Sequence, residues 1–493
     1  MPAPSHADRT SSPRLVVVAL ASCGIAVSLM QTIVMPLLPE FPRLLNTTPT
    51  NAAWLVTANL IAGAVCAPVL GRLGDMFGKR RMLLVALAVM VAGSMLGAVS
   101  DDFLVVLVAR ALQGAAMGVV PLGISIMRDE LPEEKVGSGI ALMSSTLGAG
   151  GAIGLPLTGV VAENLSWHWL FGGAAVLGVV ELVAIWRLVP ESPVRTGGRF
   201  DLIGAVGLSA ALVCLLLAVT QGNGWGWTSP AILGLFGGSM LVFLGWGVYE
   251  LRLPRRAGGS TRQPLVDLRV SARPQVLLTN IASVLIGFAM FTSFMVSAQI
   301  FQAPTDSGYG FGMSLTRSGM ALLPGGLMMI AFSPVTAGLS RRRGPRTTFL
   351  VGAAVLATAN LVRTVAPHQL VVVVVTIAVT SIGAAFAYGA IPAMIMRAVP
   401  LSETAAANSL NALARSVGTS TCSAVVAAVT TASVVQVAGV TLPTAGAYAA
   451  VFAIGSLAAV CAFVVAALIP RDAGIDAGLP LSETGQDRIR IAP

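Results

Sequence analysis

The segment GRLGDMFGKRR, residues 71–81, combines glycines, one acid and a run of bases between two long apolar stretches. Gly71 and Gly74 lack a Cβ, so helices can approach closely there. Asp75 can accept hydrogen bonds from the free N–H groups at a neighbouring helix N-terminus, where the dipole favours an anion. Lys79 follows one turn later and can pair with Asp75 or with an acid below the fourth apolar stretch. An ordinary basic loop needs neither the glycines nor the acid, so we predict a conformational latch of Gly71, Gly74, Asp75, Gly78, Lys79 and Asp129.

Two ionisable residues lie well inside apolar stretches, where a charge is costly and therefore a functional candidate. Glu181 is the one acid in such a position, about 12 residues into the sixth stretch. It could exchange protons, or it could be the structural partner of a nearby base. Arg110 is expected to face the protein interior, either in a functional role or as a buried donor to carbonyl groups, with Gln113 beside it.

Two further stretches carry side chains that could line a binding cavity. Polar residues recur every three or four positions along the thirteenth stretch, which gives one helix face a polar stripe. Cavity lining and helix–helix hydrogen bonding both explain that stripe, which consists of Thr404, Asn408, Asn411, Arg415, Thr419 and Cys422. In the ninth stretch, flexible and aromatic side chains could form an adaptable apolar surface: Phe288, Met290, Phe291, Phe294 and Met295.

The composition determines what these residues are embedded in. Of the 493 residues, 55% are hydrophobic and only 10% are charged, whereas soluble domains carry about 25% charged residues. A soluble protein of this length is excluded, and apolar runs of about 20 residues predict membrane-spanning helices. The sequence contains no nucleotide-binding loop, metal-ligand spacing or hydrolytic triad, so we expect neither an enzyme nor a cofactor.

Hydropathy predicts fourteen spans, at 14–35, 52–70, 82–100, 103–127, 138–161, 169–189, 202–220, 230–249, 276–299, 318–339, 347–365, 370–396, 404–433 and 446–469. With loops assigned alternately to the two sides, 25 of the 30 basic residues fall on one side and 3 on the other. By the positive-inside rule, both termini are cytoplasmic. The net charge of +9 is then explained by contact with anionic lipid, and no nucleic-acid partner is expected.

The two ends of the chain resemble each other. Ile126-Met127-Arg128 at the end of the fourth span matches Ile395-Met396-Arg397 at the end of the twelfth. Such internal symmetry is typical of secondary transporters. The predicted organisation is an N-terminal tail (1–13), a six-helix bundle (14–190), two linker helices (191–250), a basic cytoplasmic loop (251–275), a second six-helix bundle (276–470) and a C-terminal tail (471–493).

In the loop after the second span, the sequence resembles the major facilitator superfamily, whose pattern there is G-x-L-G/A-D-x-x-G-R/K-R/K. Fourteen spans make it similar to the drug:proton antiporter branch. Arg110-Ala111-Leu112-Gln113-Gly114 matches the R-x-x-Q-G element, and the resemblance implies proton transfer at Arg110. The run GGAIGLPLTG resembles the antiporter element of the fifth span, with its proline one place late; its residues are Gly150, Gly154, Pro156 and Gly159.

The first span departs from that family pattern. The branch usually has L-D-x-T-I-V-N there, whereas this chain reads Leu29-Met30-Gln31-Thr32-Ile33-Val34-Met35, so Met30 replaces the acid. We therefore expect a substrate cavity with few acids that favours neutral or anionic compounds over dications. The residues expected to line it are Met30, Gln31, Gln113, Phe291, Phe294, Met295, Asn408, Asn411 and Arg415.

The resemblance implies an all-α major facilitator fold of two six-helix bundles plus two inserted helices. Its expected function is proton-coupled export of small apolar compounds (drugs, antibiotics or toxic metabolites) across the cell membrane by alternating access. The implied partners are a small-molecule substrate, protons and membrane lipids, and we expect a monomer. Two alternatives remain open: a dedicated exporter of one endogenous metabolite or lipid-like molecule, and a membrane-embedded receptor or enzyme.

Overall fold

The computed structural model describes residues 12–38, 40–196, 199–252, 262–365, 369–437 and 440–470. Three parts of the predicted organisation lie outside the described residues: 1–11 of the N-terminal tail (1–13), 253–261 of the basic loop (251–275), and the C-terminal tail (471–493). So do six of the bases counted for orientation, namely Arg9, Arg255, Arg256, Arg471, Arg488 and Arg490.

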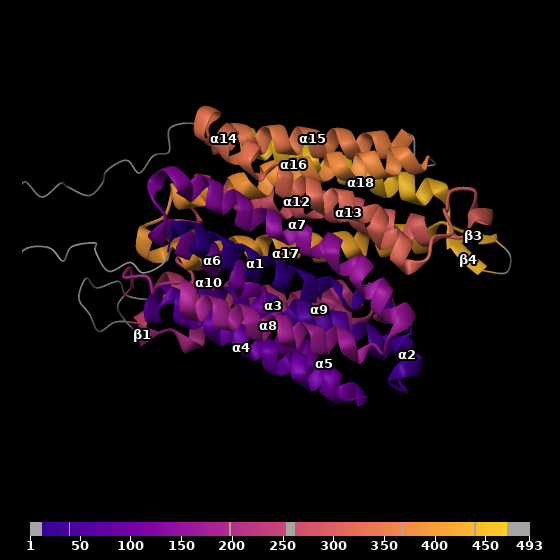
Figure 1. Ribbon diagram of the computed structural model, residues 1–493, viewed down its shortest axis with the longest axis horizontal. Coiled ribbons are helices and arrows are strands. Elements are labelled where there is room, and N and C mark those ends of the chain that lie inside the picture. Colours follow the sequence, from indigo (N-terminus) through magenta and orange to yellow (C-terminus); the bar gives the residue numbers. More distant parts are fainter. Residues whose placement is uncertain are drawn as a thin grey trace, which may run out of the picture.

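The described residues contain fourteen helical spans that are long and apolar enough to cross a membrane. The first six-helix bundle comprises α1 (Pro13–Thr32), α3 (Pro49–Phe77), α4 (Lys79–Ala98), a broken span made of α5 (Phe103–Gly114), η3 (Ala115–Gly118) and α6 (Val119–Glu130), then α7 (Glu133–Asn164) and α8 (His168–Leu188). Most helices of this bundle lie in the lower part of Figure 1, and its helix α7 crosses the middle.

The second six-helix bundle lies in the upper part of the same view (Figure 1). It comprises α12 (Pro274–Gln302), a broken span made of α13 (Leu315–Ala331) and α14 (Ser333–Arg343), then α15 (Pro345–Val365), α16 (Leu370–Met396), α17 (Thr404–Ala432) and α18 (Ala445–Ala467). The inserted helices are α9 (Leu202–Trp225) and α10 (Pro230–Arg252). The predicted fold of two bundles plus two inserted helices is confirmed.

Short elements join the spans. Along the chain these are η2 (Met35–Leu37), α2 (Phe41–Leu44), β1 (Arg199–Phe200), β2 (Arg262–Gln263), α11 (Leu268–Ser271), η4 (Thr305–Ser307), η5 (Leu401–Glu403), β3 (Val434–Val437) and β4 (Val440–Pro443). Strands β1 and β2 pair in parallel, and β3 and β4 form an antiparallel pair. Hydropathy, which finds spans, predicted none of these strands.

Local sequence explains where several helices begin and break. Side-chain oxygens of Asp102, Ser314 and Thr444 accept a backbone N–H from the first turn of α5, α13 and α18, as N-cap residues do. The tenth span breaks at Phe332, where Pro334 follows in the first turn of α14. A proline has no N–H to donate to the preceding turn, so the helix restarts there.

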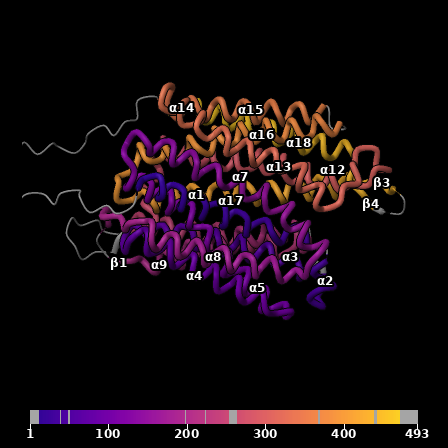
Figure 2. Tube along the Cα trace, viewed as in Figure 1, coloured from indigo at the N-terminus to yellow at the C-terminus, as the bar shows by residue number. Residues whose placement is uncertain are grey.

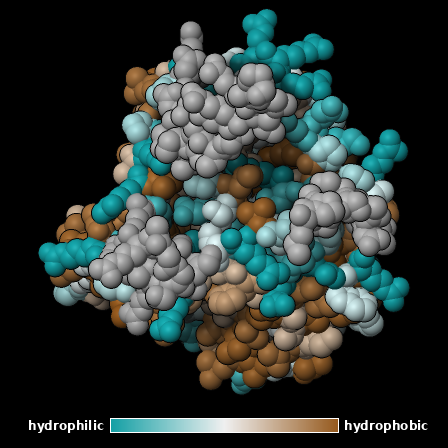
Figure 3. Space-filling view, turned by 90° about the vertical axis from the view of Figure 1, so that its left-hand side faces the viewer, coloured by the Kyte–Doolittle hydropathy of each residue, from teal (hydrophilic) through white to brown (hydrophobic). Residues whose placement is uncertain are grey.

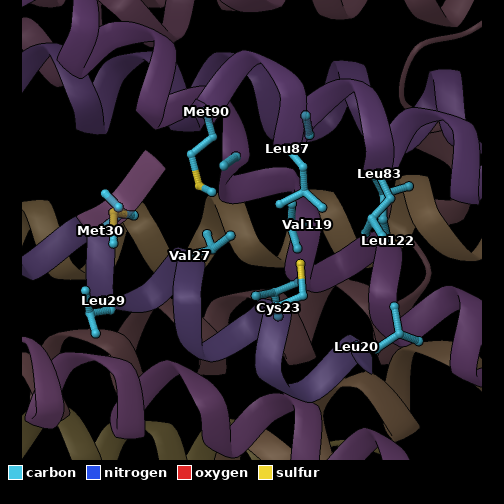
Figure 4. Packing of buried hydrophobic residues seen from close by; sticks show 14 of the residues in the cluster. Leu20, Cys23, Val27, Leu29, Met30, Leu83, Leu87, Met90, Val119 and Leu122 are labelled. Atoms are coloured by element: carbon cyan, nitrogen blue, oxygen red, sulfur yellow. The ribbon is translucent and has the colours of Figure 1, made fainter. Parts of the chain in front are cut away.

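Each bundle has its own apolar core. In the first bundle, buried side chains of α1, α4 and α6 interdigitate (Figure 4). The halves meet where α3 packs against α17 and where α7 packs against α13 and α16. Figure 2 traces α7 and α17 through the middle of the molecule, where the two bundles meet.

The inserted helices lie against this junction. Helix α9 packs against both α3 and α17, with Leu208, Leu212 and Leu216 in one apolar cluster with Ala64 and Leu413. Helix α10 packs on α9. Only 11% of the residues in its most apolar stretch are buried inside the protein. Its outward leucines are therefore suited to contact lipid.

Candidate functional site: a latch between the two halves

The Asp75 carboxylate joins the first half of the molecule to the second. It lies near the end of α3 and is fully buried. Its Oδ1 accepts the N–H of Ala405 at 3.2 Å, and its Oδ2 accepts the N–H of Ala406 at 2.9 Å. Both amides belong to the first turn of α17, whose N–H groups have no partner within the helix. An anion there also interacts favourably with the helix dipole.

Lys79 and Asp129 complete the charge cluster around Asp75. Lys79 Nζ lies 2.5 Å from Asp129 Oδ2 and 3.8 Å from Asp75 Oδ1, and all three side chains are fully buried. Ser192, which follows α8, donates to the same Asp129 oxygen at 2.6 Å. Of the two predicted partners of Lys79, Asp129 is the closer. The end of the molecule that holds these residues is called the latch end below; Figure 3 looks onto it and shows hydrophilic side chains projecting from it.

Two glycines have a clear structural role at the latch end. Gly78 has a φ of 117° between α3 and α4, which a residue with a Cβ rarely adopts. A Cβ on Gly71 would lie 2.7 Å from the Ser409 Cβ and 2.8 Å from the Ala405 carbonyl oxygen. Gly71 therefore allows α3 and α17 to touch, whereas the nearest obstacle to a Cβ on Gly74 is the flexible side chain of Leu122.

We expect Gly71→Ala to hold the latch end apart, because the new methyl group meets backbone of the opposite half. Transport should fall at least tenfold, and a pair of cysteines on α3 and α17 at this end should cross-link more slowly. Gly137→Ala is the matched control, since a Cβ on Gly137 in α7 has nothing within 4 Å. Unchanged cross-linking in Gly71→Ala would contradict this role.

A second bridge between the halves was missed by the sequence analysis. Arg128, at the end of α6, donates to the Thr404 hydroxyl and to the Met396 carbonyl, both at 2.9 Å. The repeated Ile-Met-Arg pattern was a usable signal, because it placed Arg128 and Met396 at the ends of corresponding spans. Glu191 was missed as well: its carboxylate accepts the N–H groups of Arg80 and Arg81 at 3.2 Å and so caps α4.

The residues of the antiporter element lie at two helix contacts of α7. Gly150 and Gly154 face α1, where a Cβ would meet the side chains of Ser28 and Thr32 and the backbone of Leu29. Pro156 and Gly159 face α13: Gly319 packs on the Pro156 backbone, and a Cβ on Gly159 would lie 2.7 Å from the Thr316 backbone. The element therefore connects a helix of its own half with a helix of the other half.

Arg110 is completely buried in the first bundle. Its Nε donates to the Leu55 carbonyl at 3.2 Å, and its Nη1 donates to the Met30 carbonyl at 3.1 Å and to Gln113 Oε1 at 2.7 Å. Gln113 in turn donates to Ser94 at 2.9 Å. The guanidinium thus links α5 to α1 and α3, which is the geometry of a structural donor to carbonyls.

The Met30 side chain lies in the apolar core of the first bundle, in the same cluster as Met90 (Figure 4), and only 3% of Met30 is exposed. Gln31 beside it is half-buried.

Glu181 accepts a hydrogen bond from Ser22 of α1 at 3.1 Å, and among the described residues no base lies within ion-pair distance of it. The described part of the chain therefore offers no basic partner for Glu181, which was the structural alternative to proton exchange.

The polar stripe of α17 serves helix contacts as well as the interior. Asn408 donates to the Thr404 carbonyl of its own helix at 2.9 Å. Asn411 donates to Asn280 and Ser283 of α12, at 2.9 and 2.7 Å. The Arg415 guanidinium lies 5.2 Å from the centre of the Tyr388 ring on α16, within cation–π range.

The three candidate residues of α12 are half-buried. Phe291 and Met295 pack on a cluster that includes Tyr448 and Phe452, and Phe294 packs on another that includes Leu322. The structure does not gather all the predicted cavity residues in one place, since Met30 and Gln113 lie within the first bundle. The assignment of the whole predicted set to one substrate cavity remains a prediction.

The fold defines an integral membrane protein built from two six-helix halves. The model of the Major Facilitator Superfamily matches residues 20–423. The chain therefore belongs to the major facilitator superfamily.

Relatives and solved structures agree with this family. The chain is 28% identical to the tetracenomycin C resistance and export protein of Streptomyces glaucescens over 69% of this chain and 61% of that protein. It is 25% identical to multidrug resistance protein 3 of Bacillus subtilis over 74% and 70%. The human organic anion transporter MFSD10 has a similar fold, with a TM-score of 0.63 at 17% identity, over 92% of this chain and 99% of that one. The chain spans 46% to 61% of the length of four curated relatives that it matches.

Proposed function

We propose that this chain exports small, largely apolar compounds in exchange for protons, by alternating access between its two halves. The observation that carries this proposal is the Asp75 carboxylate of the first half, held by two amides of α17 in the second. Such a contact must break for the latch end to open. The export and multidrug resistance names of two relatives support the direction of transport and the kind of substrate.

The distribution of basic residues supports an orientation in the cell membrane with both termini and the latch end in the cytoplasm. In that orientation the latch closes the cytoplasmic side while the substrate leaves on the other. We propose a monomer whose partners are one small molecule, protons and the surrounding lipids, with no cofactor.

The substrate preference follows from the missing acid of the first span. Met30 stands at that position and is buried among apolar side chains. A dication in the cavity would lack a carboxylate partner there, and desolvating its charges would cost several kcal/mol. Neutral or anionic compounds avoid this cost, and the half-buried aromatic and methionine side chains of α12 offer them an adaptable surface.

Proteoliposomes that contain the purified full chain test this function. We expect counterflow of neutral or anionic antibiotics without a pH gradient, and net transport that accelerates at least tenfold when a gradient is imposed. Dications should move more slowly than neutral analogues of the same scaffold. A transport rate that is the same with and without the pH gradient would contradict proton coupling. A dication transported as fast as its neutral analogue would contradict the proposed preference for neutral or anionic compounds.

A further inference from the structure

Two buried carboxyl groups face each other at the latch end of the inserted helices. Asp201 directly precedes α9, and Glu250 lies in the last turn of α10; they are 1% and 6% exposed. Gly204 separates them: a Cβ there would lie 2.8 Å from Glu250 Oε1 and closer still to Asp201 Oδ2. The facing oxygens can approach because this residue has no side chain.

Each carboxyl group is only partly provided with hydrogen-bond donors. Asp201 Oδ1 accepts the Tyr249 hydroxyl at 2.8 Å. Glu250 Oε1 accepts the Leu265 N–H at 3.2 Å, and the backbone N–H of Val266 also interacts with the Glu250 carboxyl group. Asp201 Oδ2 and Glu250 Oε2 are buried and have no partner among the described residues. Although Asp201 precedes a helix, its side chain does not cap it. Two carboxylates this close cannot both remain ionised at low cost, and a proton on one of them would supply a missing donor.

One cation connects this pair to the latch. Arg72, on α3 between Gly71 and Asp75, is 3% exposed. Its charge interacts with three carboxylates: Asp75, Glu403 just before α17, and Glu250. Helix α9 packs against both α3 and α17, so the carboxyl pair lies beside the junction that the latch closes. Asp267, just before α11, accepts the N–H groups of Arg269 and Val270.

We propose that Asp201 and Glu250 form a proton-binding site, a carboxyl pair that shares one proton and controls the latch through Arg72. This inference rests on the proposed function and deepens it, because it names a site for the proton. It differs from the two sites predicted from the sequence, since Arg110 and Glu181 lie in the first bundle and away from the inserted helices.

The coupling follows from competition for the one charge of Arg72. When the pair holds its proton, Glu250 attracts Arg72 less, and Arg72 interacts more strongly with Asp75 and Glu403. Glu403 belongs to the second half, so protonation stabilises the closed latch. When the O–H bond breaks and the proton leaves to water at the latch end, the negative charge on Glu250 draws Arg72 away from Glu403. Loss of the proton therefore favours opening of that end.

Infrared difference spectroscopy of the purified full chain, between acidic and alkaline samples without any substrate, tests proton binding. We expect a C=O stretching band of a protonated carboxyl group that is lost in both Glu250→Gln and Asp201→Asn. Glu134→Gln, at an exposed acid of the latch end, should retain the band. A band that persists in both single variants would overturn the proposal; should Asp201→Asn fail to fold, Glu250→Gln alone decides.

Spin labels on cysteines that replace Phe77 and Leu401, both exposed, report the separation of α3 and α17 at the latch end. We expect the wild-type separation to increase with pH, and Glu250→Gln, which mimics the protonated pair, to remain closed at every pH. An unaltered pH response in Glu250→Gln would reject the coupling. Neither measurement needs a transported compound, so a failure of proton-coupled export in proteoliposomes would be recognised separately.

Discussion

Asp75→Asn is expected to open the latch end and to lower transport roughly thirtyfold. The substitution keeps the size of the side chain but removes the charge from two hydrogen bonds to the amides of Ala405 and Ala406. Hydrogen bonds to charged groups contribute about 1.5–3 kcal/mol each. A net loss of about 2 kcal/mol from the closed state corresponds to that factor. The measurement is transport in proteoliposomes together with the separation of spin labels on α3 and α17.

Asp102→Asn is the matched control for this prediction. Asp102 also places a carboxylate on a helix N-terminus, accepting the Val105 N–H at 3.0 Å, but this contact lies within the first half. Asp102→Asn should reduce stability slightly and leave the label separation unchanged. Equal effects of the two substitutions on transport would show that Asp75 only stabilises a helix and is not a latch.

Arg110→Met is expected to destabilise the first bundle by about 3 kcal/mol, because it leaves two buried carbonyls and the Gln113 oxygen with one donor fewer. Each buried acceptor that loses its partner costs about 1–3 kcal/mol. Arg110→Lys should fall between Arg110→Met and the wild type, since one ammonium group cannot reproduce the planar set of donors. Thermal unfolding in detergent measures both, and Arg43→Met, at an exposed arginine, is the control.

The same variants separate a structural role of Arg110 from a role in proton transfer. If Arg110 is a structural donor, Arg110→Lys lowers counterflow and gradient-driven transport by the same factor. If it transfers protons, Arg110→Lys keeps counterflow and loses the response to the pH gradient. The hydrogen bonds in the structure lead us to expect the first result.

Much of the fold could be predicted because the membrane constrains the sequence strongly. Membrane spans need long apolar runs, and cytoplasmic loops are enriched in Lys and Arg. The fourteen helices and the two bundles can therefore be predicted from one sequence. The break at Phe332 and the strand pair β3–β4 were not predicted, because a hydropathy average does not register a single proline or a short hairpin.

The chemistry of the candidate site was harder to predict than the fold. The type of contact made by Asp75 could be inferred from helix dipoles, but its partner α17 lies about 330 residues away in sequence, and nothing local indicates it. Glu250 and Asp201 each lie at the edge of a span and look like ordinary interfacial acids. Only their position on either side of Gly204 makes them a pair.

The position of α9 has a consequence for compounds dissolved in the bilayer. This helix covers one seam between the halves, where α3 meets α17, and α10 covers α9 in turn. A lipophilic molecule that approached this seam from the membrane would therefore meet α10 and α9 before it reached α3 and α17. A chain with the same halves and no inserted pair would expose this seam to lipid.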